Sequence, residues 1–438
     1  MRPTYADVEH ALLGRWPETK LEPSLTRIQA LCDLLGDPQR SYPVIQLTGT
    51  NGKTSTSRMI DSLLRALDLR TGRFTSPHLE SMRERICIDG EPLSEDLFVD
   101  AFADVAAYAQ VIDDSSEHPL SFFEMIVAMA YAGFADAPVE VAIVEVGMGG
   151  TWDATSVADA QVAVVTPIDV DHSRYLGDTA GEIAVEKAGI IKPRTHAVLA
   201  DQTAEAADVL LERVASVGAT VVREGVDFGV TDRTVAVGGQ LLTIAGVART
   251  YDEIFLPLHG AYQAHNAACA VAAVEGFLGG KELDPQLVRE AFEASTSPGR
   301  LEVLRRSPTV LLDAAHNPHG VRATVEAVQE SFALSPLIGV VGVMADKDVD
   351  EILDVLEPAL AQIVCTQNTT DRAMPATELG DIAEGIFGAD RVQVVPRLDD
   401  AIDRGVELAE FGGVLITGSV VTAGQARLLL GGGTEDVA

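Results

Sequence analysis

The sequence predicts an α/β protein in two domains, each built around a mostly parallel sheet. Short apolar runs alternate with segments of helical length and spacing, as in parallel strands joined by crossover helices. The 438 residues are too many for one ordinary hydrophobic core. The turn-forming run Ser295–Gly299 interrupts the alternation, so we expect one domain at 1–297 and a second at 298–438.

The first domain opens its sheet with the apolar run at 43–47, which leads into a glycine-containing loop and a helix at 53–67. The region 219–256 differs, because its short β-rich pieces are separated by glycines; it predicts a small antiparallel patch. The other expected elements are strands at 139–146, 161–165 and 197–200 and helices at 125–134, 181–187 and 265–278.

The second domain repeats the strand–helix rhythm and is predicted to be Rossmann-like. Short connections between parallel strands favour a right-handed wound sheet. Its strands are expected at 309–313, 337–341, 362–366, 391–395 and 413–417, each separated by a segment long enough for a helix.

Composition limits the possible partners. Lysine and arginine total 32 against 66 aspartate and glutamate, giving a formal net charge of −34. Such a chain repels nucleic acid and anionic membranes, and no apolar run is long enough to span a bilayer. The four cysteines lie far apart and predict reduced thiols in a cytoplasmic protein. No continuous apolar seam stands out, so we expect a monomer.

The segment Thr48–Ser55 has the pattern of a phosphate-binding loop between a strand and a helix. Glycines let backbone N–H groups face an anion at the positive end of the helix, and Lys53 can neutralise phosphate charge. The general pattern has a further glycine where this chain has Leu47. The alternative is an ordinary strand-to-helix turn with Gly52 as its tight residue.

Three further side chains invite a chemical interpretation. Glu145 ends a buried strand, where α/β sheets bind ligands and where a carboxylate would otherwise be a costly buried charge. His172 follows the next strand and could join a divalent metal site, or be a surface loop histidine. By composition Lys187 is a surface lysine at a helix end.

Motifs along nearly the whole chain resemble one family. They are Gly-Thr-Asn-Gly-Lys at 49–53, Thr-Ser-Pro-His-Leu at 75–79, Glu-Arg-Ile at 84–86, Phe-Phe-Glu at 122–124, Glu-Val-Gly-Met-Gly-Gly at 145–150, Asp-Ala-Thr at 153–155, Asp-His at 171–172, Glu-Lys-Ala-Gly-Ile at 186–190, Pro-Gly-Arg at 298–300, Asp-Ala-Ala-His-Asn-Pro at 313–318 and Asp-Lys-Asp at 346–348. In this order they resemble the folylpolyglutamate synthase/dihydrofolate synthase family of the Mur ligase superfamily. The resemblance implies that the first domain is a P-loop-type ATPase domain.

The resemblance also implies roles for individual residues. ATP would be held by Thr50, Asn51, Gly52, Lys53, Thr54, Asn266, Arg300, Asp313 and His316. Mg²⁺ would be held by Ser76, Glu145 and His172, and Lys187 would be carbamylated and help to hold a second Mg²⁺. The catalytic set would be Lys53, Lys187, His172 and Arg300. Without the resemblance, Asn266 could simply be a helix N-cap.

The pterin end of the substrate would lie among three segments. They are Glu22, Pro23, Ser24 and Leu25; Ser121, Phe122, Phe123 and Glu124; and Trp152, Asp153 and Ala154. Aromatic faces suit a bicyclic ring, although two adjacent aromatics before a helix are also common in a core. The chain departs from the family pattern at Thr54, Thr151–Trp152, Ser156 and 261–263, where the usual basic residue is missing.

The activity implied by the resemblance is ATP-dependent addition of L-glutamate to dihydropteroate and to tetrahydrofolates through an acyl phosphate. Two alternatives remain open. One is a Mur-type peptidoglycan ligase with the same chemistry and a nucleotide-sugar acceptor. The other is a nucleotide-binding regulatory protein that carries out no ligation.

Overall fold

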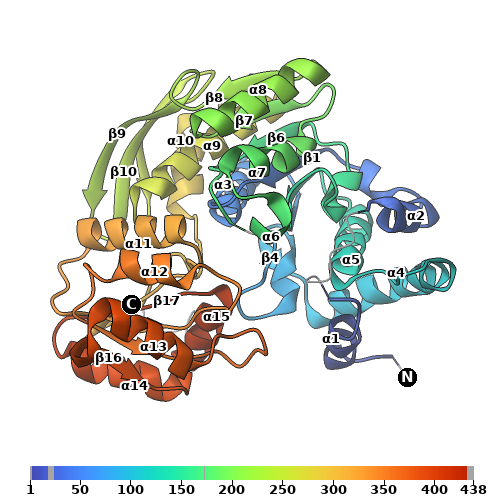
Figure 1. Cartoon of the computed structure of the whole chain (residues 1–438). Coiled ribbons are helices and arrows are strands. Elements are labelled where there is room, and N and C mark those ends of the chain that lie inside the picture. Colours follow the sequence, from blue (N-terminus) through green and yellow to red (C-terminus); the bar gives the residue numbers. More distant parts are fainter. Residues whose placement is uncertain (1, 18–23, 172, 432–438) are drawn as a thin grey trace. The chain divides into compact units, whose positions relative to one another are not determined.

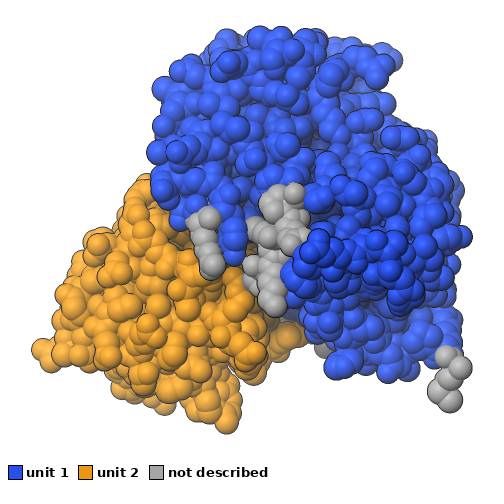
Figure 2. Space-filling model, turned by 45° about the vertical axis from the view of Figure 1, so that its right-hand side comes forward, with its two compact units in different colours: residues 1–234, 240–257, 263–296 blue, residues 235–239, 258–262, 297–438 orange. Residues whose placement is uncertain are grey.

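The computed structural model describes residues 2–17, 24–171 and 173–431 (Figure 1). The chain divides into two compact units, coloured separately in Figure 2. Unit 1 comprises residues 1–234, 240–257 and 263–296, and unit 2 comprises 235–239, 258–262 and 297–438. Within the described residues, no helix is long and apolar enough to cross a membrane.

Unit 1 is built on an eight-stranded sheet with the order β4-β3-β2-β5-β1-β6-β7-β8. Its strands are β1 (Val44–Thr48), β2 (Thr71–Phe74), β3 (Ile86–Ile88), β4 (Glu91–Pro92), β5 (Val141–Glu145), β6 (Val162–Val165), β7 (His196–Leu199) and β8 (Thr220–Arg223). The six strands from β2 to β8 in this order pair in parallel, whereas β3 and β4 add an antiparallel edge. The central strands β1 and β5 are buried along their whole length, as their apolar sequences require.

Helices cover this sheet and connect its strands (Figure 1). They are α1 (Tyr5–Leu13), α2 (Thr26–Leu34), α3 (Lys53–Ala66), α4 (Glu95–Ser115), α5 (Phe122–Asp136), α6 (Ser173–Leu176), α7 (Ala180–Lys187), α8 (Ala204–Val217), α9 (Ala261–Phe277) and α10 (Pro285–Glu293), with 3₁₀ turns η1 (Pro38–Arg40), η2 (Met82–Arg85), η3 (Ala154–Val157) and η4 (Ala188–Ile190). The apolar α5 is buried on nearly every side against α2, α4 and β2.

A separate sheet has the order β11-β10-β9 and pairs antiparallel between β10 and β11. Its strands are β9 (Gly229–Ala236), β10 (Gly239–Ala245) and β11 (Thr250–Leu256). The predicted antiparallel patch is therefore present, but it starts later than expected. The prediction was wrong for 220–223, because β8 pairs in parallel with β7 and extends the large sheet.

Unit 2 contains a six-stranded sheet with the order β12-β13-β17-β14-β15-β16. Five strands are parallel, and β12 adds an antiparallel edge. The strands are β12 (Glu302–Arg306), β13 (Thr309–Leu312), β14 (Leu337–Val341), β15 (Gln362–Cys365), β16 (Val392–Val394) and β17 (Gly413–Thr417), joined through α11 (Pro318–Ser331), α12 (Val349–Leu356), α13 (Ala376–Phe387), η5 (Ala389–Arg391), α14 (Leu398–Ala409) and α15 (Val420–Leu429). The predicted α/β fold class is thus confirmed in both units.

Candidate active site

The phosphate loop lies between β1 and α3, with α3 beginning at Lys53. Gly49 and Gly52 adopt positive φ angles of 147° and 89°. A Cβ at Gly52 would lie 2.6 Å from Oδ1 of Asn266, so a larger residue would collide with that side chain as well as strain the backbone. The loop therefore requires glycine here, and Asn266, a predicted ATP contact, borders the predicted phosphate site.

Two lysines converge on one carbonyl of this loop. Lys53 Nζ donates to Gly49 O at 2.8 Å and to Thr50 O at 3.2 Å, and Lys187 Nζ donates to Gly49 O at 2.9 Å. Lys187 is only 5% exposed, so the interpretation as a surface lysine is wrong. Burial, reinforced by the charge of Lys53, lowers the pKa of Lys187 to about 7.

Glu145 lies where the parallel strands end beside the loop. It is fully buried, and β-pairing places it next to Leu47 of β1. Thr54 Oγ1 donates to its Oε2 at 3.0 Å, and Ser57 Oγ donates to its Oε1. The pairing of Phe74 with Val144 brings the backbone that leads to Ser76 to the same edge of the sheet.

Two of the three predicted Mg²⁺ ligands are among the described residues, and both offer the oxygen atoms that Mg²⁺ prefers. Glu145 supplies a carboxylate and Ser76 a hydroxyl, both hard oxygen donors. His172 lies outside the described residues. The segment before it is tied to the loop, since Thr50 Oγ1 donates to Asp169 O at 2.8 Å and accepts from Asp169 N at 3.0 Å. Among the residues that the structure describes, no group of three or more His, Cys, Asp or Glu could hold a metal.

Asn266 is joined to the loop through Gln263, a residue to which the sequence analysis assigned no role. Gln263 Nε2 donates to Ser55 Oγ at 3.2 Å, and Gln263 Oε1 accepts from Asn266 Nδ2 at 3.1 Å. Because α9 begins at Ala261, Asn266 lies inside the helix. The alternative interpretation of Asn266 as an N-cap is therefore wrong.

Residues 121–124 stabilise the start of α5 by capping and by packing on the core. Ser121 and Glu124 form a reciprocal capping box, and Glu124 also pairs with Arg27 Nε at 3.2 Å. Phe122 is 7% exposed within the core cluster, and Phe123 packs against that cluster. A pterin contact by these residues stays a prediction.

The other predicted substrate segments are likewise engaged in the fold. Asp153 is buried and accepts hydrogen bonds from Gly147 N, Met148 N, Thr155 N and Thr155 Oγ1. Burial raises the pKa of Asp153, although these hydrogen bonds oppose the shift. Trp152 is partly buried against the cluster around α7, and Ala154 is buried. Ser24 Oγ accepts from Thr26 N and Leu25 packs on the core, whereas Glu22 and Pro23 lie outside the described residues.

The loop between β2 and η2 contains an arrangement that sequence reasoning missed. The Glu84 carboxylate accepts backbone hydrogen bonds from Leu79, Glu80 and Ser81 at 2.9, 2.9 and 2.7 Å. Arg85 Nε donates to His78 Nδ1 at 2.9 Å. Burial and the neighbouring Arg85 charge lower the pKa of His78 to about 4. The sequence analysis noted Glu-Arg-Ile at 84–86 as a motif. It did not predict that the Glu84 carboxylate binds the backbone of residues 79–81.

The predicted ATP contacts of the second domain belong to unit 2. Asp313 is buried and accepts from Leu301 N at 2.7 Å, Ala315 N at 2.8 Å and Thr324 Oγ1 at 3.0 Å. Burial raises the pKa of Asp313, and the charge of Arg300 opposes this. His316 Nδ1 lies 3.0 Å from Ala314 O. A role for these residues toward ATP stays a prediction.

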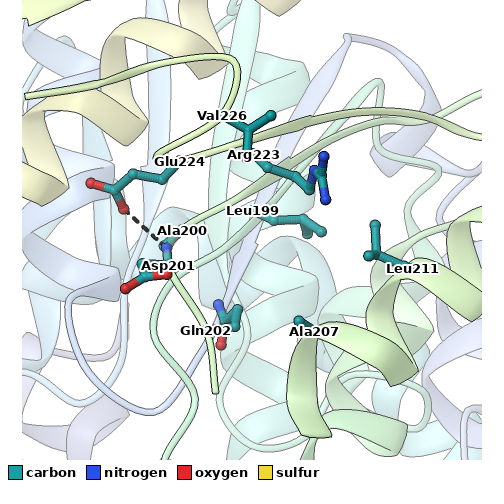
Figure 3. A pocket seen from close by; sticks show the side chains of 9 residues that line it. All are labelled: Leu199, Ala200, Asp201, Gln202, Ala207, Leu211, Arg223, Glu224 and Val226. Atoms are coloured by element: carbon teal, nitrogen blue, oxygen red, sulfur yellow. Dashed lines mark hydrogen bonds between the residues drawn. The ribbon is translucent and has the colours of Figure 1, made fainter. Parts of the chain in front are cut away.

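A small pocket opens at the carboxyl ends of β7 and β8 (Figure 3). Its wall includes Leu199, Leu211 and the Arg223 side chain. Glu224, on its rim, accepts from Asp201 N at 3.0 Å and pairs with His265 Nδ1 at 2.5 Å. His265 precedes Asn266, so this pocket neighbours the start of α9 and was not predicted.

Comparisons with known proteins identify the family of the chain. The Mur ligase middle domain matches residues 47–274, and the Mur ligase glutamate ligase domain matches 299–420. The dihydrofolate synthase/folylpolyglutamate synthase of Mycobacterium tuberculosis is 49% identical over 97% of this chain and 93% of its own length. The folylpolyglutamate synthase of Lacticaseibacillus casei is 34% identical, over 93% and 94%.

Solved structures give the same result. M. tuberculosis folylpolyglutamate synthase, crystallised with ADP and AMPPCP, superposes with a TM-score of 0.95 at 49% identity, covering 98% of this chain and 99% of the other. An FPGS–AMPPCP–folate complex superposes with a TM-score of 0.87 at 30% identity, covering 98% and 100%. The chain therefore belongs to the Mur ligase family, in its folylpolyglutamate synthase/dihydrofolate synthase branch.

Proposed function

We propose that this chain is a bifunctional dihydrofolate synthase/folylpolyglutamate synthase, which adds L-glutamate to dihydropteroate and to tetrahydrofolates at the expense of ATP. The observation that carries the proposal is the phosphate loop, with Lys53 and buried Lys187 on one carbonyl beside Glu145. The relatives of that name and the complexes with ATP analogues and folate support the choice of substrates.

The chemistry begins with activation of a carboxylate, which alone has no adequate leaving group. An oxygen of the substrate carboxylate attacks the γ-phosphorus of ATP, the bond to the β–γ bridging oxygen breaks, and ADP leaves. The amine of L-glutamate then attacks the acyl carbon, loses a proton to solvent, and phosphate departs. This route needs no protein nucleophile, so positioning and electrostatics do most of the work.

The loop residues supply part of that electrostatic work. Gly52 is the N-cap of α3, so the positive end of this helix faces the phosphates in our proposal, and Lys53 balances negative charge on the phosphoryl oxygens. The N–H groups of Thr50 and Asn51 donate to Pro167 O at 3.0 and 3.4 Å and hold the loop in place. In our proposal Arg300 adds a second cation, with Asp313 and His316 nearby in sequence contacting the nucleotide.

Mg²⁺ fits the oxygen donors present, and we propose that Ser76, Glu145 and His172 hold it. Bound there, it would screen the charge of the phosphates. Thr54 and Ser57 orient the Glu145 carboxylate through their hydroxyl groups.

The surroundings of Lys187 favour carbamylation. Two ammonium groups sharing the Gly49 carbonyl repel each other, and burial makes the neutral amine of Lys187 accessible near neutral pH. A carbamate at Lys187 would replace this repulsion by attraction to Lys53. It would also offer an oxygen ligand to a second Mg²⁺.

A direct assay tests the proposal. Phosphate release is measured with ATP, Mg²⁺ and L-glutamate, offering dihydropteroate, tetrahydrofolate or a UDP-muramoyl acceptor. We expect release with both pteridine substrates and none with the sugar nucleotide. Turnover only with the UDP-muramoyl acceptor would identify a peptidoglycan ligase, and ATP binding without any release would identify a regulatory protein. We also propose that the chain acts as a cytoplasmic monomer.

A further inference from the structure

His78 is held from one side of its ring. Arg85 is 4% exposed; its Nε donates to His78 Nδ1 at 2.9 Å, and its guanidinium lies 4.9 Å from the centre of the Phe122 ring. The arginine is thus fixed between an imidazole and an aromatic ring, and it fixes the imidazole in turn.

This hydrogen bond assigns the proton on the ring. An arginine N–H can only donate, so Nδ1 must be the acceptor. The proton of the neutral imidazole is therefore on Nε2. Nε2 has no hydrogen-bond partner among the residues that the structure describes, whereas Nδ1 is engaged. His78 consequently presents one uncharged, oriented donor.

The backbone around His78 is also fixed. Glu84 binds the N–H groups of the three residues that follow His78, and Ser81 in turn caps η2. Ser76, a proposed metal ligand, lies two residues before His78. Through Arg85, the imidazole is tied to Phe122 at the start of α5. His78 therefore links Ser76, the proposed metal ligand, to Phe122, the proposed substrate contact to which Arg85 ties the imidazole.

We propose that His78 is a substrate-contacting residue, which donates from Nε2 to an oxygen of the carboxyl group that is activated on the pteroyl acid. The inference rests on the proposed function and deepens it. In the proposed function the acid end of the substrate lies near the phosphates, and its pterin ring lies near Phe122 and Phe123. A neutral donor between the two orients one carboxylate oxygen and leaves the other to attack the γ-phosphorus.

A pair of substitutions separates this role from a purely structural one. In His78→Gln the side-chain amide reaches the position of Nε2 and keeps a donor there. In His78→Asn the amide reaches only the position of Nδ1, where its oxygen can still accept from Arg85. His78→Ala removes both functions, and His10→Gln, on the exposed face of α1, is the matched control.

The first readout is the Kd of dihydropteroate in the presence of AMPPCP and Mg²⁺, and the second is kcat and KM for dihydropteroate. We expect His78→Gln to stay within about threefold of the wild type. His78→Asn and His78→Ala should weaken dihydropteroate binding about 10- to 100-fold, the value of one hydrogen bond to a charged group, with the Kd of ADP unchanged. Unchanged ADP affinity also shows that the variants are folded.

Two results would overturn the inference. One is wild-type binding by His78→Asn, which would leave only the contact with Arg85. The other is binding by His78→Gln as weak as that of His78→Ala. The wild-type protein tests the proposed function separately, because dihydropteroate binding without phosphate release would refute ligation and still report on His78.

Discussion

Lys187 should react with CO₂ at neutral pH, unlike ordinary lysines. Only the neutral amine attacks CO₂, and burial together with Lys53 lowers the pKa of Lys187 to about 7. At pH 7 roughly half of the molecules then carry the neutral amine, against roughly one in 2,500 for a lysine of ordinary pKa. The structure thus gives Lys187 about a thousandfold advantage in reactive amine.

The assay is ¹³C NMR of the protein in ¹³C-labelled bicarbonate. We expect a carbamate signal at pH 7 to 8 that disappears in Lys187→Met and persists in Lys281→Met, a matched change at an exposed lysine. Because the folded-state pKa is lowered, the neutral amine persists down to about pH 7 and is lost below it. The signal should therefore fall between pH 7 and pH 6.

Ligase activity should also depend on Lys187. Lys187→Ala is expected to lose ligase turnover, and added bicarbonate should not restore it, because the variant has no amine to modify. A carbamate signal that survives Lys187→Met would refute the reasoning, as would a fully active Lys187→Ala variant. Absence of any signal at high bicarbonate would equally reject the link between burial and reactivity.

Three further changes test the loop and its support. Lys53→Ala should lower kcat for glutamate addition about 10²- to 10³-fold with an unchanged thermal melting curve, since it removes charge stabilisation at the half-buried start of α3. Unchanged turnover would reject the phosphate site. Gly52→Ala should weaken ADP binding, measured by calorimetry, at least about tenfold, because its φ of 89° and the 2.6 Å approach to Asn266 Oδ1 exclude a Cβ; native affinity would contradict the described loop. Asp153→Asn should lower the free energy of unfolding by about 2–4 kcal/mol in chemical denaturation, because the amide cannot accept at both positions where Asp153 now binds donors; a loss of pterin binding at native stability would instead assign it to the substrate.

The central strands could be predicted because burial on both faces demands continuous apolar runs. Val141–Glu145 and Gly413–Thr417 are of this kind. Two edge strands were not predicted, because an edge strand needs no continuous apolar run. Glu302–Arg306 is mostly polar, and Glu91–Pro92 is exposed and only two residues long. β8 was assigned to the wrong sheet, because a half-exposed strand carries no signal of its partner.

Some features of the candidate site could likewise be predicted from the sequence, and others could not. Glu145 could be predicted from its place at the end of a buried strand. Ser121 and Glu124 could have been identified as a capping box from their spacing alone, and they form that capping box at the start of α5. The tie between His78 and Arg85 could not be predicted, because hydrogen bonding across a loop depends on backbone path rather than on sequence period.

Lys187 shows how a motif can encode a distant contact through packing. A Cβ at Gly150 would lie 2.7 Å from Glu186 O and 2.9 Å from Lys187 O, and one at Gly189 would lie 2.5 Å from Thr151 Cα. The glycines therefore let the segment after β5 and the end of α7 approach closely. Glu145 and Gly150 belong to one short motif. This motif therefore both places a carboxylate at the end of β5 and lets α7, which carries Lys187, pack close enough to reach Gly49. Burial, and with it the lowered pKa of Lys187, follows from that approach and not from the local composition of α7.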